Sequence, residues 1–502
     1  MQPFRLLLLI IAGLTVFAAA SPARAEWRRA ESERFIVYSS GDEASLRQFV
    51  RRLETFDFVV RRRLGLPPDP PARRFPIYLV RNPDQMRQAL PGISELVAGI
   101  YLAEDEDIFA MARLDTRPET ILHEYFHHLS IQTGGLSTYP SWLIEGLAEY
   151  YSTAEVEDGS VRIGGYPGAR AAWLAESHLW IPLDQLVSRR VGEMTRWNRF
   201  ATYYPVAWLM THWFMNTPER RAMLAAYVRD MQTGADSVVA MERATGMTMA
   251  ELKRALRAYM GEEVTFTVYT FEQPEIPIRV ETLGRSADRL LLLGQRLKVG
   301  VPDDRRAATA AEVRREAARY PDDPFALFQL GHAELHFGDP AAGEVALERL
   351  LALQPGHVEA LQLMAQRRLQ QAEALERAAA TPLIRQGRAY LVRAYEEEPL
   401  NYRTLQLLAE SRSGAANYPN DNDLETWDSA FMLAPQLTGI RFGYARALML
   451  KGRHDDAIAL LEPVANSPHA GEAAEKAEAM MERARAGLPP LDEPEASTGE
   501  RR

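Results

Sequence analysis

Residues 26–115 contain several short apolar runs and one long stretch with helical periodicity. Four runs rich in β-branched, aromatic and aliphatic residues are predicted to be strands: residues 34–38, 75–80, 97–102 and 107–111. Residues 44–64 have the periodicity of an amphipathic helix, which ends at Gly65 with two prolines beyond it. An acidic turn containing Asp105 and Glu106 joins the last two strands. This region therefore predicts a small sheet accompanied by a helix.

Helical periodicity dominates the rest of the chain. It covers residues 117–260 and returns beyond residue 285, where it becomes quasi-periodic. Between these two parts, residues 263–280 are rich in Val, Thr, Phe and Tyr and predict a small β insert. The chain thus has a mixed first part, a helical middle and a repetitive helical end.

Two units in the repetitive part share one pattern. Residues 324–357 form a 34-residue unit in which Leu330, Gly331 and Ala333 hold small or apolar positions, and residues 443–468 follow the same template. Weaker copies are predicted at residues 290–321, 383–399 and 403–435. The pattern resembles tetratricopeptide arrays, which stack helix pairs and leave a concave surface. The resemblance implies docking of a protein substrate or partner; a helical spacer without a ligand is the alternative.

The first 25 residues predict export. Arg5 precedes an apolar run of 15 residues, and an A-x-A site ends at Ala25. This is the pattern of a secretory signal peptide, with cleavage expected after Ala25. The run is shorter than the about 20 residues that span a bilayer, so no stable membrane span is expected after cleavage. Together with the absence of cysteine, the pattern favours a bacterial envelope protein, in the periplasm.

Charge and composition exclude several classes of protein. The net charge of −10 argues against nucleic-acid binding through a basic surface. The lack of cysteine excludes disulfides, a thiol nucleophile and zinc sites built on thiolates. A metal site in this chain therefore has to use His, Asp and Glu.

Residues 123–127, with the sequence HEYFH, form an HExxH motif. On a helix, positions i and i+4 share a face, so His123 and His127 are expected to point at one ion. Glu124 lies about 100° around the helix and is expected beside the ion without binding it. Residues 118–122 supply a helix start, with a proline and an acid in the first turn. The alternative is a pair of histidines on an ordinary helix.

Glu145 follows His127 after 17 intervening residues, within WLIEGLA at residues 142–148. A catalytic zinc site needs three protein ligands and one open position. HExxH followed by W-L-x-E-G-x-A resembles the gluzincin metallopeptidases, nearest to peptidase MA-like domains and more distantly the aminopeptidase-N superfamily. The resemblance implies a zincin-like α+β fold and Zn²⁺ held by His123, His127 and Glu145. It also implies that Glu124 is the general base.

The same resemblance implies two supporting roles. Glu149, one turn after Glu145, is expected to accept the free ring N–H of a zinc-bound histidine, His123; a solvated helix acid is the alternative. Tyr204 is expected to donate to the oxyanion, with the adjacent Tyr203 as the alternative donor. Residues 107–111 take the place of the family's edge strand but do not match the aminopeptidase sequence G-A-M-E-N, so the mode of cleavage is left open.

Three other histidines are expected outside the metal site. His128 should point off the metal face of its helix. His178 and His212 stand in apolar surroundings and are expected to be core histidines with satisfied hydrogen bonds.

These observations predict five segments: a signal peptide at 1–25, a zincin-like metallopeptidase domain at 26–262, a β-rich linker at 263–284, an all-α tetratricopeptide-like domain at 285–488 and a solvated tail at 489–502. The predicted function is hydrolysis of peptide bonds in peptide or protein substrates by a periplasmic zinc peptidase, whose repeats hold a protein substrate or partner. The alternative is a non-catalytic envelope scaffold that acts through the repeats.

Overall fold

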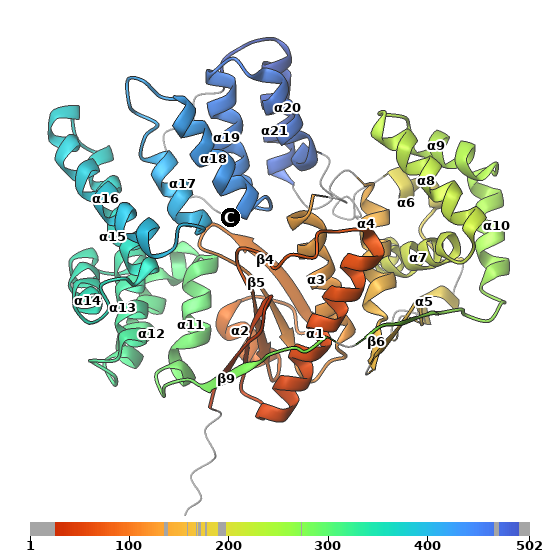
Figure 1. The fold of residues 1–502 in the computed structure, drawn as a ribbon, viewed down its shortest axis with the longest axis horizontal. Coiled ribbons are helices and arrows are strands. Elements are labelled where there is room, and N and C mark those ends of the chain that lie inside the picture. The colour runs from red at the N-terminus through yellow and green to blue at the C-terminus, as the bar shows by residue number, and fades with distance from the viewer. Residues whose placement is uncertain are drawn as a thin grey trace, which may run out of the picture.

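The computed structural model describes most of the chain (Figure 1). The described residues are 26–134, 139–157, 159–166, 168, 172–175, 178–188, 197–272, 274–465 and 471–490. The expected signal peptide and all of the tail beyond residue 490 lie outside them. Every helix within the described ranges is too short or too polar to cross a bilayer.

A six-stranded mixed sheet forms the centre of the first part, in the order β4-β5-β3-β2-β1-β9. Its strands are β1 (Arg28–Glu31), β2 (Phe35–Ser39), β3 (Phe75–Val80), β4 (Gly99–Glu104), β5 (Asp107–Arg113) and β9 (Arg279–Thr282). Strands β2, β3 and β5 are parallel, while β4 runs antiparallel to β5. The four predicted strands are confirmed within two residues. Strand β1 was missed because its sequence, RRAE, is almost entirely polar.

The position predicted for residues 107–111 is wrong. Strand β5 pairs with β3 on one side and β4 on the other, so β4 and not β5 is the edge strand. The burial pattern fits this order, because every residue of β4 is half-buried, whereas β5 is buried from Asp107 to Ala112. The sequence pattern predicted both strands, but it does not contain their order in the sheet.

Helices cover both faces of this sheet. Alternate strand residues such as Val37, Ile77 and Ala110 pack against α1 (Glu43–Leu64) and α3 (Glu119–Gln132). The opposite face packs against α2 (Pro83–Ala89) and α11 (Ala287–Val299), the first helix of the repetitive part. The residues alternate between the two faces because successive side chains of a strand point to opposite sides. The repeats therefore begin as a layer of the first fold unit.

The middle of the chain is mainly helical, as predicted. Its helices are α4 (Ser141–Ser152), α5 (Ala172–Ala175), α6 (Leu183–Ser188), α7 (Trp197–Met215), α8 (Pro218–Gln232), α9 (Ser237–Thr245) and α10 (Met249–Tyr259). A three-stranded sheet joins them, made of β6 (Glu155–Glu157), β7 (Ser160–Ile163) and β8 (Thr267–Thr270) in that order. The segment predicted as one β insert thus supplies β8 to the small sheet and β9 to the large one.

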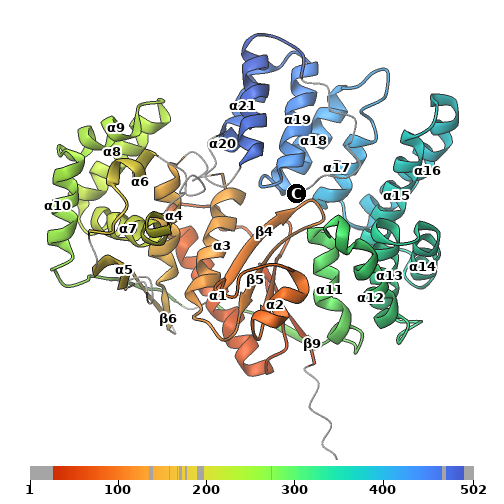
Figure 2. The ribbon, with the colours of Figure 1, turned by 180° about the vertical axis from the view of Figure 1, so that it is seen from behind.

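Successive helices that pack against one another make up the described residues beyond 285. After α11 come α12 (Arg306–Ala317), α13 (Pro324–Phe337), α14 (Pro340–Leu353), α15 (Val358–Glu373), α16 (Arg377–Glu397), α17 (Tyr402–Glu410), α18 (Asp421–Leu433), α19 (Thr438–Leu450), α20 (His454–Ala465) and α21 (Glu472–Arg485). The unit predicted at 324–357 matches the pair α13–α14, whereas the one predicted at 443–468 begins five residues inside α19 and includes α20. Helices α11 to α21 follow an arc beside the large sheet and above α3 (Figures 1 and 2).

Candidate metal centre

Helix α3 carries the HExxH motif and points both histidines at one place. It begins at Glu119 after Pro118, as the sequence predicts. The Nε2 atoms of His123 and His127 are 3.0 Å apart. His123 is 7% exposed, while the side chain of His127 is 17% exposed. The pair therefore faces the interior and keeps one histidine open to solvent.

Helix α4 brings the third residue to the same point. Oε2 of Glu145 lies 3.4 Å from Nε2 of His123 and 3.4 Å from Nε2 of His127, and Glu145 is 1% exposed. In a tetrahedral zinc site with bonds of about 2.0–2.1 Å, ligand atoms are separated by about 3.3 Å. The three donor atoms thus have the spacing and the chemical types that fit Zn²⁺. The predicted ligand set lies together in space.

Glu149 lies on the far side of His123. Its Oε1 is 3.0 Å from Nδ1 of His123, and the residue is 4% exposed. The contact favours the tautomer with the proton on Nδ1, which leaves the lone pair of Nε2 pointing at the centre. Burial lowers the pKa of His123, but the carboxylates of Glu149 and Glu145 outweigh it and raise this pKa to about 10. Glu149 is therefore not a solvated helix acid.

This electrostatic setting predicts a proton release when zinc binds. Without metal, His123 is protonated at pH 8 because its pKa is about 10, and a metal ligand must be neutral. Zinc uptake at pH 8 should release more protons from the parent protein than from Glu149→Gln, in which the raising carboxylate is gone. Calorimetry in buffers of different ionisation enthalpy measures the release. Equal release by the two proteins contradicts the prediction, and zinc affinity should also fall about 10–100-fold in the variant.

A buried ion-pair network holds α3 against α1. The hydroxyl of Tyr125 donates to Asp57 on α1, which also contacts the guanidinium groups of Arg61 and Arg34. Asp57 is 1% exposed. Tyr125 and Glu124 are neighbours about 100° apart on the helix, so this anchor fixes the direction of Glu124 as well. The sequence pattern did not predict this network; the one available signal was an Asp-x-x-x-Arg spacing on a predicted helix.

Glu124 lies beside the centre and is half-buried. Its charge is near enough to contribute to the raised pKa of His123, after those of Glu149 and Glu145. The Glu124 carboxylate is partly reachable by solvent, and Glu124 directly follows the first donor residue in the chain. It can accept a proton from a molecule held there.

The two adjacent tyrosines on α7 differ in burial and in the residues they contact. Tyr203 is 0% exposed and shares a hydrogen bond of 3.0 Å with the hydroxyl of Ser141. Tyr204 is half-buried, and its ring centroid is 6.2 Å from that of His123. Burial raises the pKa of Tyr203, with Ser141 acting in the opposite direction. Tyr204 therefore faces the metal centre, whereas Tyr203 belongs to the core.

Gly146 explains how α4 approaches α7. A Cβ atom at this position would overlap the Thr211 hydroxyl oxygen and lie 2.7 Å from the carbonyl oxygen of Ala207. Both of these residues are on α7, and the second contact is to backbone. The glycine directly after Glu145 therefore lets the helix of the third ligand pack closely on the helix of Tyr204.

Replacing Gly146 with alanine should destabilise the protein. The added methyl group has to displace α7, and overpacking of this kind costs about 1–3 kcal/mol. We expect a lower thermal midpoint and weaker zinc binding, since α4 carries Glu145. Gly414→Ala is the matched control, because a Cβ there meets nothing within 4 Å. Equal midpoints for the two variants would show that α7 is not held by this contact.

The other histidines lie outside the centre. His128 points off the metal face as predicted, with its ring stacked on Phe75 at 4.0 Å and its Nδ1 3.4 Å from the Tyr101 hydroxyl. Burial lowers its pKa to about 3, with Arg73 and Arg61 acting in the same direction.

The two lone histidines, His178 and His212, differ in burial. His212 is a satisfied core histidine, as expected, because its ring nitrogens are each 2.8 Å from a partner, the Tyr259 hydroxyl and the Thr265 carbonyl. His178 is exposed, so the prediction of a core position is wrong. Trp180, two residues further along the chain, is buried, whereas the side chain of His178 is not.

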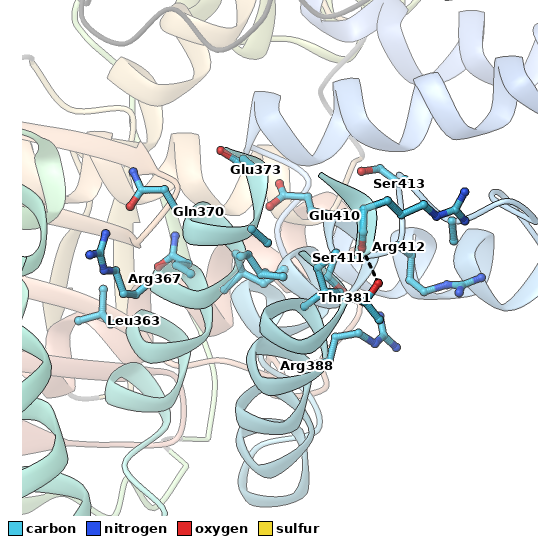
Figure 3. A pocket seen from close by; sticks show the side chains of 18 of the residues that line it. Leu363, Arg367, Gln370, Glu373, Thr381, Arg388, Glu410, Ser411, Arg412 and Ser413 are labelled. Carbon is cyan, nitrogen blue, oxygen red and sulfur yellow. Dashed lines mark hydrogen bonds between the residues drawn. The ribbon is translucent and has the colours of Figure 1, made fainter. Parts of the chain in front are cut away.

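A groove in the repeats has a volume of about 720 Å³. Side chains of α15, α16 and the end of α17 line it (Figure 3). Many of them are charged, including Arg367, Glu373, Arg388, Glu410 and Arg412. Such a lining suits a polar peptide segment better than an apolar ligand.

Comparison with known proteins finds similarity to repeat proteins. No protein-family model matches the chain, and no curated protein matches it. Among solved structures, a thermophilic TPR protein from Thermus thermophilus aligns with 18% identity and a TM-score of 0.34, covering 39% of this chain and 97% of that one. MamA from Desulfovibrio magneticus aligns with 19% identity and a TM-score of 0.27, covering 40% of this chain and 98% of that one. The helical repeat region is defined here by the chain's own helix pairs, and such repeats suggest protein partners.

Proposed function

We propose that this protein is a zinc-dependent peptidase of the gluzincin type with a zincin-like catalytic part. The observation that carries the proposal is the convergence of His123, His127 and Glu145, whose donor atoms are 3.0–3.4 Å apart. Three ligands, one of them open to solvent, suit a catalytic ion better than a structural one, which is normally enclosed by four. The export signal predicted at residues 1–25 supports a periplasmic location.

The residues around the centre have complementary tasks. His123, His127 and Glu145 would hold a zinc ion, which would lower the pKa of a water molecule and polarise a carbonyl group. Glu124 accepts a proton from the attacking water and delivers it to the nitrogen of the leaving amine. Glu149 keeps His123 in the binding tautomer, and the Tyr204 hydroxyl donates to the oxygen of the scissile carbonyl as negative charge develops on it.

The outer edge of β4 is the best place for a peptide substrate. Within the described residues, β4 ends the sheet order and lies along α3, where Tyr101 reaches His128. Backbone groups on such an edge can pair with an extended peptide, as in other complexes that add a strand to a sheet. A peptide paired there would pass beside the HExxH helix.

Replacing Tyr204 with phenylalanine should lower kcat about 10²–10³-fold with little change in KM. The hydroxyl is used where charge develops, so its loss affects the transition state more than the bound substrate. The adjacent Tyr203→Phe is the matched control, since Tyr203 bonds to Ser141 in the core. Tyr203→Phe should lower the thermal midpoint and leave kcat unchanged. Equal kcat values for the two variants would remove Tyr204 from the mechanism.

The first test of the function is peptide mapping by mass spectrometry after incubation of a mixed peptide library with the mature, zinc-loaded protein. Cuts absent with Glu124→Gln would identify the peptidase, and their positions would separate end-trimming from internal cleavage. No cuts by a protein holding zinc would contradict the proposal.

A second candidate function is a non-catalytic envelope scaffold. The observation in its favour is the charged groove between α15, α16 and α17. If the groove holds a partner, Arg367→Glu and Arg412→Glu should weaken peptide capture by the full chain, while Glu124→Gln should not. The full chain is needed because α11 packs on the large sheet, so an isolated repeat region would expose apolar side chains such as Leu291 and Leu292.

A further inference from the structure

A second group of histidine and carboxylate side chains lies far along the sequence from the HExxH motif. His332 and His336 are spaced i, i+4 on α13, so they share one face of that helix. Glu106, in the turn between β4 and β5, faces them, with its Oε2 3.0 Å from Nε2 of His332. One donor atom from each of the three residues lies within 4.8 Å of the others.

We propose that Glu106, His332 and His336 bind a second divalent transition-metal ion, which joins the sheet to the repeat array. Two imidazoles and one carboxylate are ligands that Zn²⁺ and its neighbours in the first transition row accept. The site is distinct from the HExxH centre, since none of its ligands is shared. It also does not depend on the proposed peptidase function.

His332 supplies an independent observation for this site. It is 0% exposed, and among the described residues neither of its ring nitrogens forms a hydrogen bond. The close Glu106 oxygen is not aligned as a hydrogen-bond acceptor. Buried polar groups normally have aligned partners. A shared ion explains the arrangement, because donor atoms around an ion point at the ion and not at one another.

The site can be reached from two cavities. His336 is exposed and lines the groove of about 720 Å³, while Glu106 lines a separate cavity of about 470 Å³ between the sheet and the repeats. Arg403 is near enough to Glu106 to act on it electrostatically, and its positive charge opposes the binding of a cation.

An ion at this site would lie between the large sheet and the repeats. The β4–β5 turn comes from the first part of the chain, and α13 belongs to the helical repeats. Lys298 makes a related link nearby, with contacts to Asp107 and Glu359. A metal bridge would strengthen the same junction, on which the position of the groove relative to β4 depends.

The test is a count of bound zinc in tag-free mature protein, by elemental mass spectrometry after loading with ZnCl₂ and desalting. The parent should retain about two ions per chain, and His336→Ala and His127→Ala about one each. The double variant should retain none. His178→Ala, which removes another exposed histidine, should match the parent. His336 is exposed, so its replacement should leave the fold intact, and Glu106→Gln provides a second variant of similar size.

The outcomes separate the two sites. A parent with one ion that His336→Ala retains and His127→Ala loses overturns the second site alone. A parent with one ion that shows the reverse pattern supports the second site and removes the HExxH centre. Zinc counts unaffected by both His336→Ala and Glu106→Gln also overturn the proposal, leaving an ordinary histidine–glutamate contact.

Discussion

Glu124→Gln is expected to lower peptide turnover by about 10²–10⁴-fold or more while zinc stays bound. The amide has nearly the same shape as the carboxylate but cannot accept a proton from water at neutral pH. Glu124 is not among the three converging donor atoms, so the metal content should not change. The measurement is kcat on a peptide found to be cut by the parent, together with zinc content.

The control for this prediction is Glu119→Gln, which removes a carboxylate from the first turn of the same helix. It alters the charge of α3 without touching the centre and should retain turnover. If Glu124→Gln and the control are equally active, another group accepts the proton and the proposed mechanism fails.

His127→Ala is expected to abolish zinc binding at the HExxH centre and, with it, peptide turnover. Its effect on affinity should exceed the about 10–100-fold that loss of a hydrogen-bond partner to a ligand costs, because a metal–nitrogen bond itself is removed. Of the three ligands, His127 is the most exposed, with 17% of its side chain accessible. Its replacement should therefore disturb the core least.

Zinc titration and circular dichroism together test this second prediction. The variant should keep the parent's helical signal and lose the high-affinity binding. His178→Ala, at an exposed histidine, should behave like the parent in both measurements. A variant that still binds zinc tightly and still cuts peptides would mean that catalysis uses a different metal site or none.

Much of the candidate metal centre was predictable because its three donor residues come from local patterns. The i, i+4 spacing of His123 and His127 is a property of any helix. Glu145 stands in a second motif of seven residues, and Glu149 is one turn further on. The choice between Tyr203 and Tyr204 was not predictable, since adjacent residues differ by about 100° in direction and only the packing of α7 sets the phase.

Other features depended on contacts between distant segments. Position 146 requires glycine because Thr211 and Ala207 on another helix lie too close for a Cβ atom. The same holds for Asp57 and Tyr125, which are 68 residues apart in the chain. His332 and His336 had a visible spacing, but without Glu106, which lies beside them only in the folded chain, the spacing indicated nothing.

The sequence by itself determined several local elements: the strands at residues 75–80 and 107–111, the helix at 44–64, the HExxH helix and the helix pair at 324–357. The segment at 383–399, expected to be a copy of the repeat, lies almost entirely within the single helix α16. A periodicity of 2 or about 3.6 residues identifies a strand or a helix, because the local backbone geometry sets the face on which each side chain lies. Only the tertiary structure decided that β4 is the edge strand, that residues 263–280 divide between two sheets and that α11 covers the large sheet. In each case several apolar surfaces of similar character could have packed together. Because hydrophobic burial is non-directional, the local pattern of apolar residues does not show which surface an element packs against.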